Sequence, residues 1–349
     1  MKTLLVDGNS LLKNSFEATL STEEYKKNFN GIYLFLLKLR IILDSDSYTH
    51  LRVVFDGEKS GSLRREVYPE YKLKRHSKEK TEFEKEKSFK FNHQKNQLKE
   101  YLSYFCSVYE DINVEADDII AEYIRRKASD EKITIVTGDF DLLSQISPYV
   151  NVYYLNKSFK NKTRIVERYE KDNERKNLVI DHKNFKKIFG FPYENIILIK
   201  TICGDNSDEI KNIKGVKETS LFNCFPDIQK KPIKIDEILE QCKIINESDT
   251  TVLKKIKQNI LEGITDGVQG KDILEINGRI VDLSNKEFIT EECINNLNDI
   301  NFFSKEKFVP KNSASMVEKM KKSGLLEFIE YKSKNIKYFF KPFLKTFSK

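Results

Sequence analysis

Three short apolar runs, each leading to an aspartate, place the strongest constraint on how this chain folds. The runs are Leu4-Leu5-Val6 before Asp7, Val53-Val54-Phe55 before Asp56, and Ile133-Thr134-Ile135-Val136 shortly before Asp139. Such runs are typical of strands that are buried on both faces of a parallel sheet. Segments with apolar residues at helical spacing, 31–43 and 98–109, lie between them. This alternation predicts an α/β fold with a central, mainly parallel sheet flanked by helices.

The carboxyl ends of parallel strands meet at one edge of a sheet, where folds of this class have their active crevice. We therefore expect the three aspartates to lie together there. Three further acidic groups are Glu115-Ala116-Asp117-Asp118, which opens an apolar-periodic helix, Asp139 with Asp141, and Asp205 with Asp208. Alone, each fits a helix cap or a turn. Spacing predicts that Asp139 and Asp141 point to one side, and that Asp205 and Asp208 are neighbours on a helical turn.

Together these nine carboxylates would repel one another and destabilise the fold. Hard divalent cations that bind oxygen resolve the conflict. An all-carboxylate site suits Mg²⁺, with Mn²⁺ as a substitute, better than zinc, and the four histidines and five cysteines form no zinc motif. Two such ions suit the in-line attack of water on a phosphodiester. The sequence thus predicts a metal-dependent nuclease.

Composition indicates the compartment and the kind of partner of the chain, but it does not identify the reaction. The net charge of +7 is a mild excess, so anion binding depends on a local patch. Five scattered cysteines indicate a reducing cytoplasm, which is the host cytoplasm if a phage encodes the chain. The chain starts with an apolar strand and no signal peptide, and the apolar stretch 32–43 is too short and too charged to span a bilayer. We expect a monomer with no membrane partner.

Basic and aromatic residues are interleaved between about residues 57 and 97. Tyr71-Lys72-Leu73-Lys74-Arg75 is the most basic part, and Phe83, Phe89 and Phe91 follow. A lone charge run is usually solvated surface. This one directly follows the Asp56 motif, which favours contact with DNA through counterion release. We expect an insertion that orders around a single-stranded 5′ end, with aromatic rings that stack on an unpaired base.

In combination the motifs resemble those of the 5′-nuclease family, which contains flap endonucleases, the N-terminal domain of bacterial DNA polymerase I and phage 5′-exonucleases. The matching segments are Val6-Asp7-Gly8-Asn9-Ser10-Leu11, Val54-Phe55-Asp56-Gly57, Arg64-Arg65 with Tyr71-Lys72 and Arg75, Glu115-Ala116-Asp117-Asp118, Thr137-Gly138-Asp139 with Asp141-Leu142-Leu143, and Gly204-Asp205 with Ser207-Asp208. They occur in order over residues 3–225. Residues 59–75 resemble most the phage ribonuclease H branch.

The resemblance implies a role for each matched residue. One metal site would consist of Asp7, Asp56, Glu115 and Asp117, and a second, bridged by Asp117, of Asp118, Asp139, Asp141, Asp205 and Asp208. Lys72 would be the electrostatic partner of the scissile phosphate, with Arg75 nearby, in a helical arch. The implied DNA contacts are Arg64, Arg65, Tyr71, Lys72, Lys74, Arg75, Lys211, Lys214, Gly215 and Lys217. Family members cut 5′ flaps and 5′ ends of DNA, or of RNA paired to DNA, during lagging-strand maturation. The resemblance therefore implies primer or flap removal in phage replication, with ribonuclease H activity as a further expectation.

One segment departs from the family. Its fifth motif continues into a helix-hairpin-helix with two glycines and a proline, whereas Ile210–Thr219 keeps only Gly215. Positive φ angles are disfavoured at the lysines and glutamate that stand there instead, which puts in doubt a potassium ion held by hairpin carbonyls. Phosphate contact through the lysines and a merely solvated turn both stay open. We expect an α/β nuclease core at 1–160 with the arch at about 57–97, a linker and hairpin-like DNA-binding region at 161–265, and a C-terminal helical region at 266–349.

The last residues permit two interpretations. The spacing of Ile336, Phe339 and Phe340 resembles a sliding-clamp-binding peptide over Ser333–Phe340, although Ser333 replaces the usual glutamine. Apolar residues near a terminus also dock on their own domain. A single-strand-binding protein is a further expected partner, beside branched or 5′-ended DNA and RNA/DNA.

Two other functions compete with a structure-dependent 5′-nuclease. A PIN-type ribonuclease typically has fewer carboxylates and no Gly-Asp-x-Ser-Asp followed by a DNA-binding helical region. A non-catalytic nucleic-acid-binding protein on this scaffold would be expected to have lost metal ligands, and all nine matched positions are present here. Both are therefore less favoured.

Overall fold

The computed structural model describes residues 1–21, 28–74, 79, 81–155, 179–266, 270, 272–310 and 313–346. Its centre is a six-stranded sheet in the order β3-β2-β1-β4-β5-β6. The strands are β1 (Lys2–Asp7), β2 (His50–Asp56), β3 (Ser107–Asp111), β4 (Lys132–Thr137), β5 (Val150–Tyr154) and β6 (Val179–Ile180). All neighbours are parallel except β5 and β6. The predicted central, mainly parallel sheet is confirmed.

The register of the central strands brings the predicted aspartates to one edge. In β1, Val6 pairs with Val53 of β2 and with Val136 of β4. These strands are buried over almost their whole length, as their continuous apolar runs predict. Because β1, β2 and β4 run in one direction and end at Asp7, Asp56 and Thr137, their last residues lie at the same side of the sheet.

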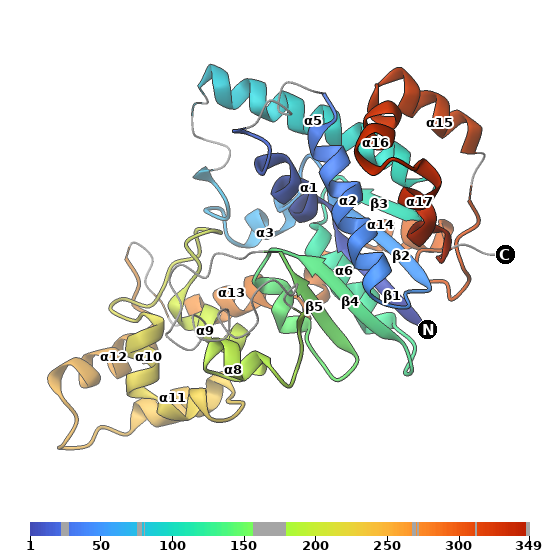
Figure 1. Ribbon diagram of the computed structural model, residues 1–349. Coiled ribbons are helices and arrows are strands. Elements are labelled where there is room, and N and C mark those ends of the chain that lie inside the picture. Colours follow the sequence, from blue (N-terminus) through green and yellow to red (C-terminus); the bar gives the residue numbers. More distant parts are fainter. Residues whose placement is uncertain are drawn as a thin grey trace.

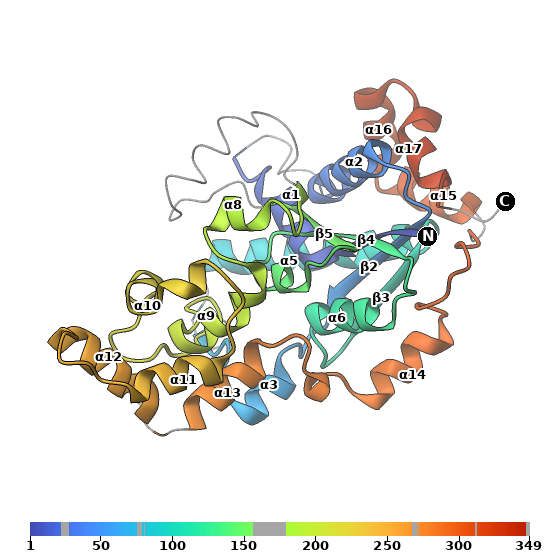
Figure 2. The same cartoon turned by 90° about the horizontal axis from the view of Figure 1, so that it is seen from below.

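Helices cover both faces of the sheet (Figures 1 and 2). One face carries α1 (Gly8–Glu17), α2 (Asn30–Ser45), α5 (Glu82–Leu102), α15 (Ser313–Lys322), α16 (Leu325–Ser333) and α17 (Ile336–Leu344), and the other carries α3 (Ser62–Val67), α6 (Ala116–Arg126), α13 (Asp272–Val281) and α14 (Glu291–Asp299). Successive side chains of β1 alternate between the two cores, with Leu4 and Val6 in one and Leu5 in the other. The C-terminal region is thus divided between the two faces.

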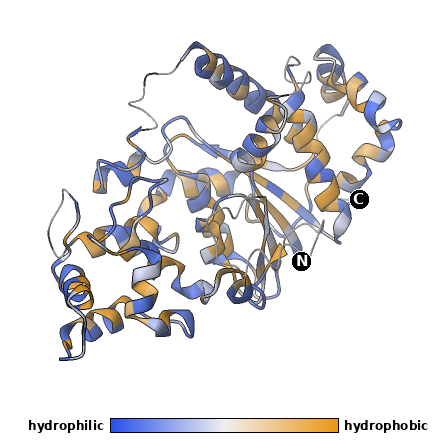
Figure 3. Cartoon of the chain, turned by 60° about the vertical axis from the view of Figure 1, so that its left-hand side comes forward, coloured by the Kyte–Doolittle hydropathy of each residue, from blue (hydrophilic) through white to orange (hydrophobic). Residues whose placement is uncertain are grey.

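The remaining helices extend beyond the edge of the sheet (Figure 1). They are α8 (Phe185–Phe189), α9 (Ile196–Cys203), α10 (Glu218–Cys224), α11 (Ile235–Lys243) and α12 (Thr251–Glu262), with short 3-10 turns η2 (Asp141–Gln145), η3 (Tyr193–Asn195), η4 (Pro226–Gln229) and η5 (Lys286–Phe288). Helix α8 ends at Gly190, which has a φ of 84° and separates it from η3 and α9. Apolar residues cluster on the inward faces throughout (Figure 3).

One predicted helix is partly wrong. The apolar spacing over 98–109 predicted a single helix, but α5 ends at Leu102 and residues from Ser107 form β3. The backbone N–H groups of Phe105 and Cys106 turn back to Leu102 O, and β3 then pairs with β2. Pairing with the edge of β2 therefore outweighs the helical spacing of these residues. Sequence spacing does not show this, because strand pairing depends on residues that are distant in the chain.

In the part of the chain that the structure describes, no helix combines the length and the apolar character needed to cross a membrane. Among its described residues, the arch segment contains α3 and α5, and α5 begins at a capping box made by Thr81 and Glu84. Arg75 lies outside the described residues.

The C-terminal segment Ser333–Phe340 is not a free peptide. Phe339 and Phe343 of α17 are fully buried, and the Phe339 ring stacks on Tyr33 of α2. Phe340 stacks on Phe105, with ring centroids 5.2 Å apart. Phe339 and Phe340 already pack in this core, so binding of a sliding clamp through Ser333–Phe340 would require them to undock, and it stays a prediction. Docking on the parent domain, the other interpretation, is what the structure shows.

We expect Phe339→Ala to lower the free energy of unfolding by about 3–5 kcal/mol, because it leaves a cavity against α2. Urea unfolding followed by circular dichroism measures this change. Tyr338→Ala is the matched control: Tyr338 is 56% exposed and contacts the Arg40 guanidinium, so its loss should cost less than about 1 kcal/mol. Equal midpoints for wild type and Phe339→Ala would contradict the docked position of α17.

Candidate active site

The ends of β1 and β2 hold their aspartates in fixed positions. Asp7 caps α1: its Oδ1 accepts a hydrogen bond from the Ser10 backbone N–H (2.9 Å) and its Oδ2 accepts one from Thr137 Oγ1 (2.8 Å). Asp56 Oδ1 accepts a hydrogen bond from the Ala116 backbone N–H (2.8 Å) at the start of α6. These bonds join the ends of β1 and β4 to the start of α1, and the end of β2 to the start of α6. The site is therefore built into the rigid part of the fold.

A cavity of about 610 Å³ lies at these strand ends. Five of its lining residues are carboxylates from the predicted set, namely Asp7, Asp56, Glu115, Asp117 and Asp139. Lys72 and Lys13 also line it, together with Phe91 of α5. The structure thus brings together five of the nine predicted carboxylates, from three strand ends and one helix start.

Burial and neighbouring carboxylates raise the pKa of three of these groups. Burial, and then the charge of Asp56, raises the pKa of Asp7 to about 7. Burial, and then the charges of Asp139 and Asp7, raises the pKa of Asp117 well above its usual range. Burial also raises the pKa of Asp56. Oxygen donors that repel one another in this way match the ligand set of a hard divalent cation, which would lower all three pKa values.

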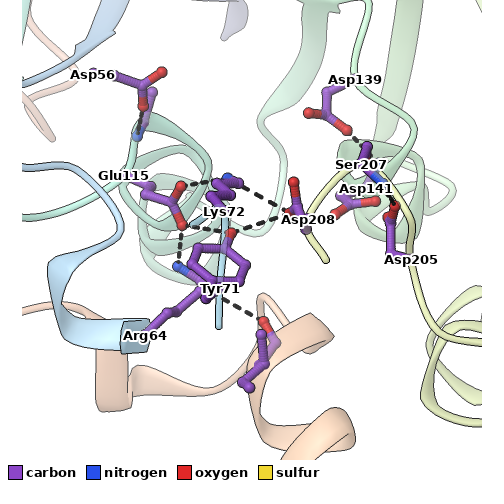
Figure 4. A network of polar contacts seen from close by, with 12 residues as sticks. Asp56, Arg64, Tyr71, Lys72, Glu115, Asp139, Asp141, Asp205, Ser207 and Asp208 are labelled. Atoms are coloured by element: carbon purple, nitrogen blue, oxygen red, sulfur yellow. Dashed lines mark hydrogen bonds and ion pairs between the residues drawn. The ribbon is translucent and has the colours of Figure 1, made fainter. Parts of the chain in front are cut away.

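Glu115 behaves differently because two cations contact it. Burial raises its pKa, but Lys72 and Arg64 outweigh burial and lower it to about 2. Lys72 Nζ lies 2.5 Å from Glu115 Oε1 and 3.5 Å from Asp208 Oδ2 (Figure 4). Lys72 adopts a left-handed backbone conformation, with a φ of 54°, at the turn that aims it at the cavity.

Arg64 and Asp118 form a buried pair, each 2% exposed. Arg64 Nη1 and Nη2 lie 2.5 and 2.9 Å from the two Asp118 carboxylate oxygens, and Nε donates to Ile280 O. This corrects two expectations: Arg64 is no surface contact for DNA, and Asp118 is turned away from the cavity. A planar guanidinium that binds a carboxylate through two parallel bonds satisfies both groups internally.

Tyr71 is also placed differently from the prediction. It is 3% exposed, and its hydroxyl donates to Glu115 Oε2 (3.0 Å) and Asp208 Oδ2 (3.1 Å) (Figure 4). A DNA contact through Tyr71 does not fit this burial. Its role in the structure is to join the arch segment to two of the predicted metal ligands.

Of the carboxylates assigned to a second metal site, Asp141 and Asp208 line one small pocket together with Asp117, whereas Asp139 lines the larger cavity. Asp141 turns to Lys200 of α9, whereas Asp139 lines the cavity, so the two do not share one side. Asp205 pairs with Lys200 at 2.5 Å, and Lys200 lowers the pKa of Asp205 against the effect of burial.

Asp205 and Asp208 are not neighbours on a helical turn either. The Asp205 N–H donates to Ile210 O and the Ile210 N–H to Asp205 O, which closes a tight loop. That loop aims Asp208 at Tyr71 and Lys72, whereas Asp205 pairs with Lys200. The helical spacing failed because Gly204 and Glu209, which both have a positive φ (66° and 63°), bound a loop here.

Lys200 is a site residue that the sequence reasoning missed. It is the one charged residue of the otherwise apolar helix Ile196–Cys203, five positions before Asp205. An isolated charge in a mostly buried helix needs a partner, which was the available signal. Among the residues that the structure describes, no three aspartate, glutamate, histidine or cysteine side chains are grouped to hold a metal ion, and Lys72 and Lys200 contact several of the candidates.

The remaining predicted DNA contacts lie near the surface. Lys211 and Lys214 make exposed ion pairs with Glu70 and Asp266, which contribute little to stability. Lys217 and Lys74 are exposed, Arg65 is half-buried, and Gly215 has a φ of 77°. Their contact with DNA stays a prediction.

Comparisons with known proteins agree with this geometry. Residues 2–175 match the family model described as 5′-3′ exonuclease, N-terminal resolvase-like domain. A 5′-3′ exonuclease of Mycoplasmopsis pulmonis is 29% identical over 294 residues, which cover 80% of this chain and 82% of that protein. DNA polymerase I of Bacillus caldotenax is 30% identical over 243 residues, 68% of this chain, but the chain spans 25% of the polymerase.

Solved structures show the same fold. The T5 5′-exonuclease with bound zinc superposes with a TM-score of 0.66 at 19% identity, over 87% of this chain and 99% of that one. The bacteriophage T5 flap endonuclease, in a pseudo-enzyme–product complex with DNA and metal ions, has a TM-score of 0.66 at 17% identity, over 88% and 100% of the two chains.

We expect Asp117→Asn to stabilise the metal-free protein. A raised pKa means that ionising the carboxyl lowers the free energy of unfolding. The stability present when the carboxyl is protonated is therefore lost as pH rises from the usual pKa through the raised pKa. For Asp7 that window runs from 3.8 to about 7. The variant should gain about 0.5–2 kcal/mol over wild type above neutral pH, and less in acid. Urea unfolding in EDTA across pH tests this, with the exposed Asp130→Asn as control; an Asp117→Asn protein less stable than wild type above neutral pH would refute mutual repulsion.

Proposed function

This chain belongs to the 5′-3′ exonuclease family, and from that premise we propose that it is a divalent-metal-dependent 5′-3′ exonuclease and flap endonuclease. The observation that carries the proposal is the cavity at the strand ends, where Asp7, Asp56, Glu115, Asp117 and Asp139 meet and where burial and neighbouring carboxylates raise the pKa of Asp7 and Asp117. Its substrates would be branched or 5′-ended DNA, and its role the removal of flaps or primers in replication. A single-strand-binding protein remains a proposed partner.

The same five carboxylates would hold Mg²⁺, with Mn²⁺ as a substitute, because they offer only oxygen donors. A bound ion would lower the pKa of the attacking water and offset charge on the scissile phosphate. Lys72, which lines this cavity, would contact that phosphate once it leaves Glu115. Asp141, Asp205 and Asp208 are the candidates for a second ion, and Lys200 contacts the first two.

The rest of the chain would bind the substrate. We propose that the basic arch, with Lys74 at its exposed turn, surrounds the single-stranded 5′ end. The loop 211–217, with Lys211, Lys214 and Lys217, would contact the phosphate backbone of the duplex part. This corresponds to a nuclease core at 1–160, a DNA-binding region at 161–265 and a C-terminal helical region at 266–349.

Cleavage of a flap substrate tests the function directly. A flap oligonucleotide labelled at its 5′ end should be cut in Mg²⁺ and left intact in EDTA. Asp117→Asn should reduce the rate by at least about 100-fold while it keeps DNA binding, and Asp130→Asn should cut normally. Metal-independent cleavage, or none with any divalent ion, would overturn the proposal. A second arm with RNA as the 5′ strand tests ribonuclease H activity, and cleavage of free single-stranded RNA alone would favour a PIN-type ribonuclease.

Lys200 should compete with metal at Asp141 and Asp205. We expect Lys200→Met to bind Mn²⁺ more tightly by about tenfold at one site, because removing the ammonium leaves two carboxylates without a cation. Calorimetric titration of the metal-free protein measures this, and Lys187→Met on the exposed side of α8 is the control. Superimposable isotherms for wild type and Lys200→Met would remove Lys200 from the metal chemistry.

A further inference from the structure

The loop 211–217 lies between the Asp205–Ile210 turn and α10, and it is anchored at both sides. The Ile213 N–H donates to Ile202 O of α9 (2.8 Å), and the Lys214 N–H donates to Ile264 O after α12 (2.7 Å). Ile213 and Val216 are buried, whereas Lys214 and Gly215 are exposed. Two apolar side chains thus hold the loop down while its outer turn faces solvent.

Side-chain amides donate hydrogen bonds to the carbonyl oxygens of this loop. Asn212 Nδ2 donates to both Ile213 O (2.8 Å) and Val216 O (3.1 Å). Asn259 Nδ2 of α12 donates to Lys214 O (2.8 Å), and Asn277 Nδ2 of α13 donates to Lys211 O (3.0 Å). Only the NH₂ end of an amide can donate to a carbonyl, so these contacts also fix how each amide is oriented.

Three of the four carbonyls from Ile213 to Val216 accept from a side-chain amide. The fourth, Gly215 O, lies 3.3 Å from Ser220 Oγ, which also lies 2.9 Å from Lys217 O. Asn259 and Asn277 are 6% and 0% exposed, so their amides are built into the core between helices. A cation held by loop carbonyls would need these same oxygen atoms. The residues present therefore do not fit the potassium ion that the family resemblance suggests.

We propose that the amides of Asn212, Asn259 and Asn277 replace a monovalent cation as the element that shapes this loop for duplex DNA. Asn212 is a positioning residue: it fixes the distance between the carbonyls of Ile213 and Val216, and thereby the backbone N–H groups and lysines on the outer turn. Asn259 and Asn277 tie that turn to α12 and α13. The inference rests on the proposed function, in which this loop contacts the phosphate backbone.

The test is DNA binding by the full chain in three salts. Fluorescence anisotropy measures the binding of a labelled flap duplex in KCl, NaCl and tetramethylammonium chloride. The three solutions have equal ionic strength and all contain EDTA. Wild type should bind equally within about twofold in all three, since no ion-specific site is involved. Binding about tenfold tighter in KCl than in both other salts would overturn the proposal.

Variants test the role of Asn212 separately. Asn212→Ala should weaken binding by about tenfold in every salt, because two carbonyls lose their donor. Asn212→Asp should weaken it further in tetramethylammonium and recover in KCl, because a carboxylate beside two carbonyls needs a cation. The exposed Asn223→Ala on α10 is the matched control and should bind as wild type.

Each outcome separates this inference from the proposed function. Wild type that binds and cuts flaps but shows unchanged binding in Asn212→Ala refutes the inference alone. Wild type that binds no flap DNA in any salt refutes the proposed function. Thermal unfolding of each variant shows whether it is folded, and the wild-type salt series stands even where a variant does not fold.

Discussion

Repulsion among carboxylates is the interaction on which the rest of this structure depends. Parallel strands deliver Asp7, Asp56 and Asp139 to one edge, and α6 adds Glu115 and Asp117. The fold answers this concentration of negative charge with three internal cations, Arg64, Lys72 and Lys200, each from a different element. Two carboxylates that these cations do not contact, Asp7 and Asp117, have a raised pKa. A divalent ion would stabilise the protein most at these two carboxylates.

The cations also connect parts of the chain that are distant in sequence. Arg64 of α3 contacts Asp118 of α6 and the last turn of α13 through Ile280 O. Lys200 joins α9 to the turn after β4. Removing one partner of a buried pair leaves an uncompensated charge and costs several kcal/mol. The helical region beyond the sheet is therefore positioned against the site by charge as well as by apolar packing.

The sequence predicts the strands and the strand-end aspartates because both follow local rules. Continuous apolar runs predict buried strands, and Asp7, Asp56 and Asp139 follow from where those runs end. It does not predict the partners of Asp118, Asp141 and Asp208, because these depend on which basic residue folding brings nearby. Arg64 is 54 residues from Asp118, and Lys200 is 59 from Asp141. The same limit explains β3, whose strand conformation depends on the edge offered by β2, and the tail, whose motif spacing is that of an amphipathic helix face.

The position of α17 has a consequence for how the chain reaches its native state. Phe339 and Phe343 belong to the same core as Leu4 and Val6 of β1, so the first strand and the last described helix complete one another. During synthesis the apolar surface of α2 that receives them emerges some 300 residues earlier. That surface stays open to chaperones, or to a second nascent chain, until α17 has left the ribosome. The core on this face of the sheet therefore closes late, although the strand and helix that begin it are made first.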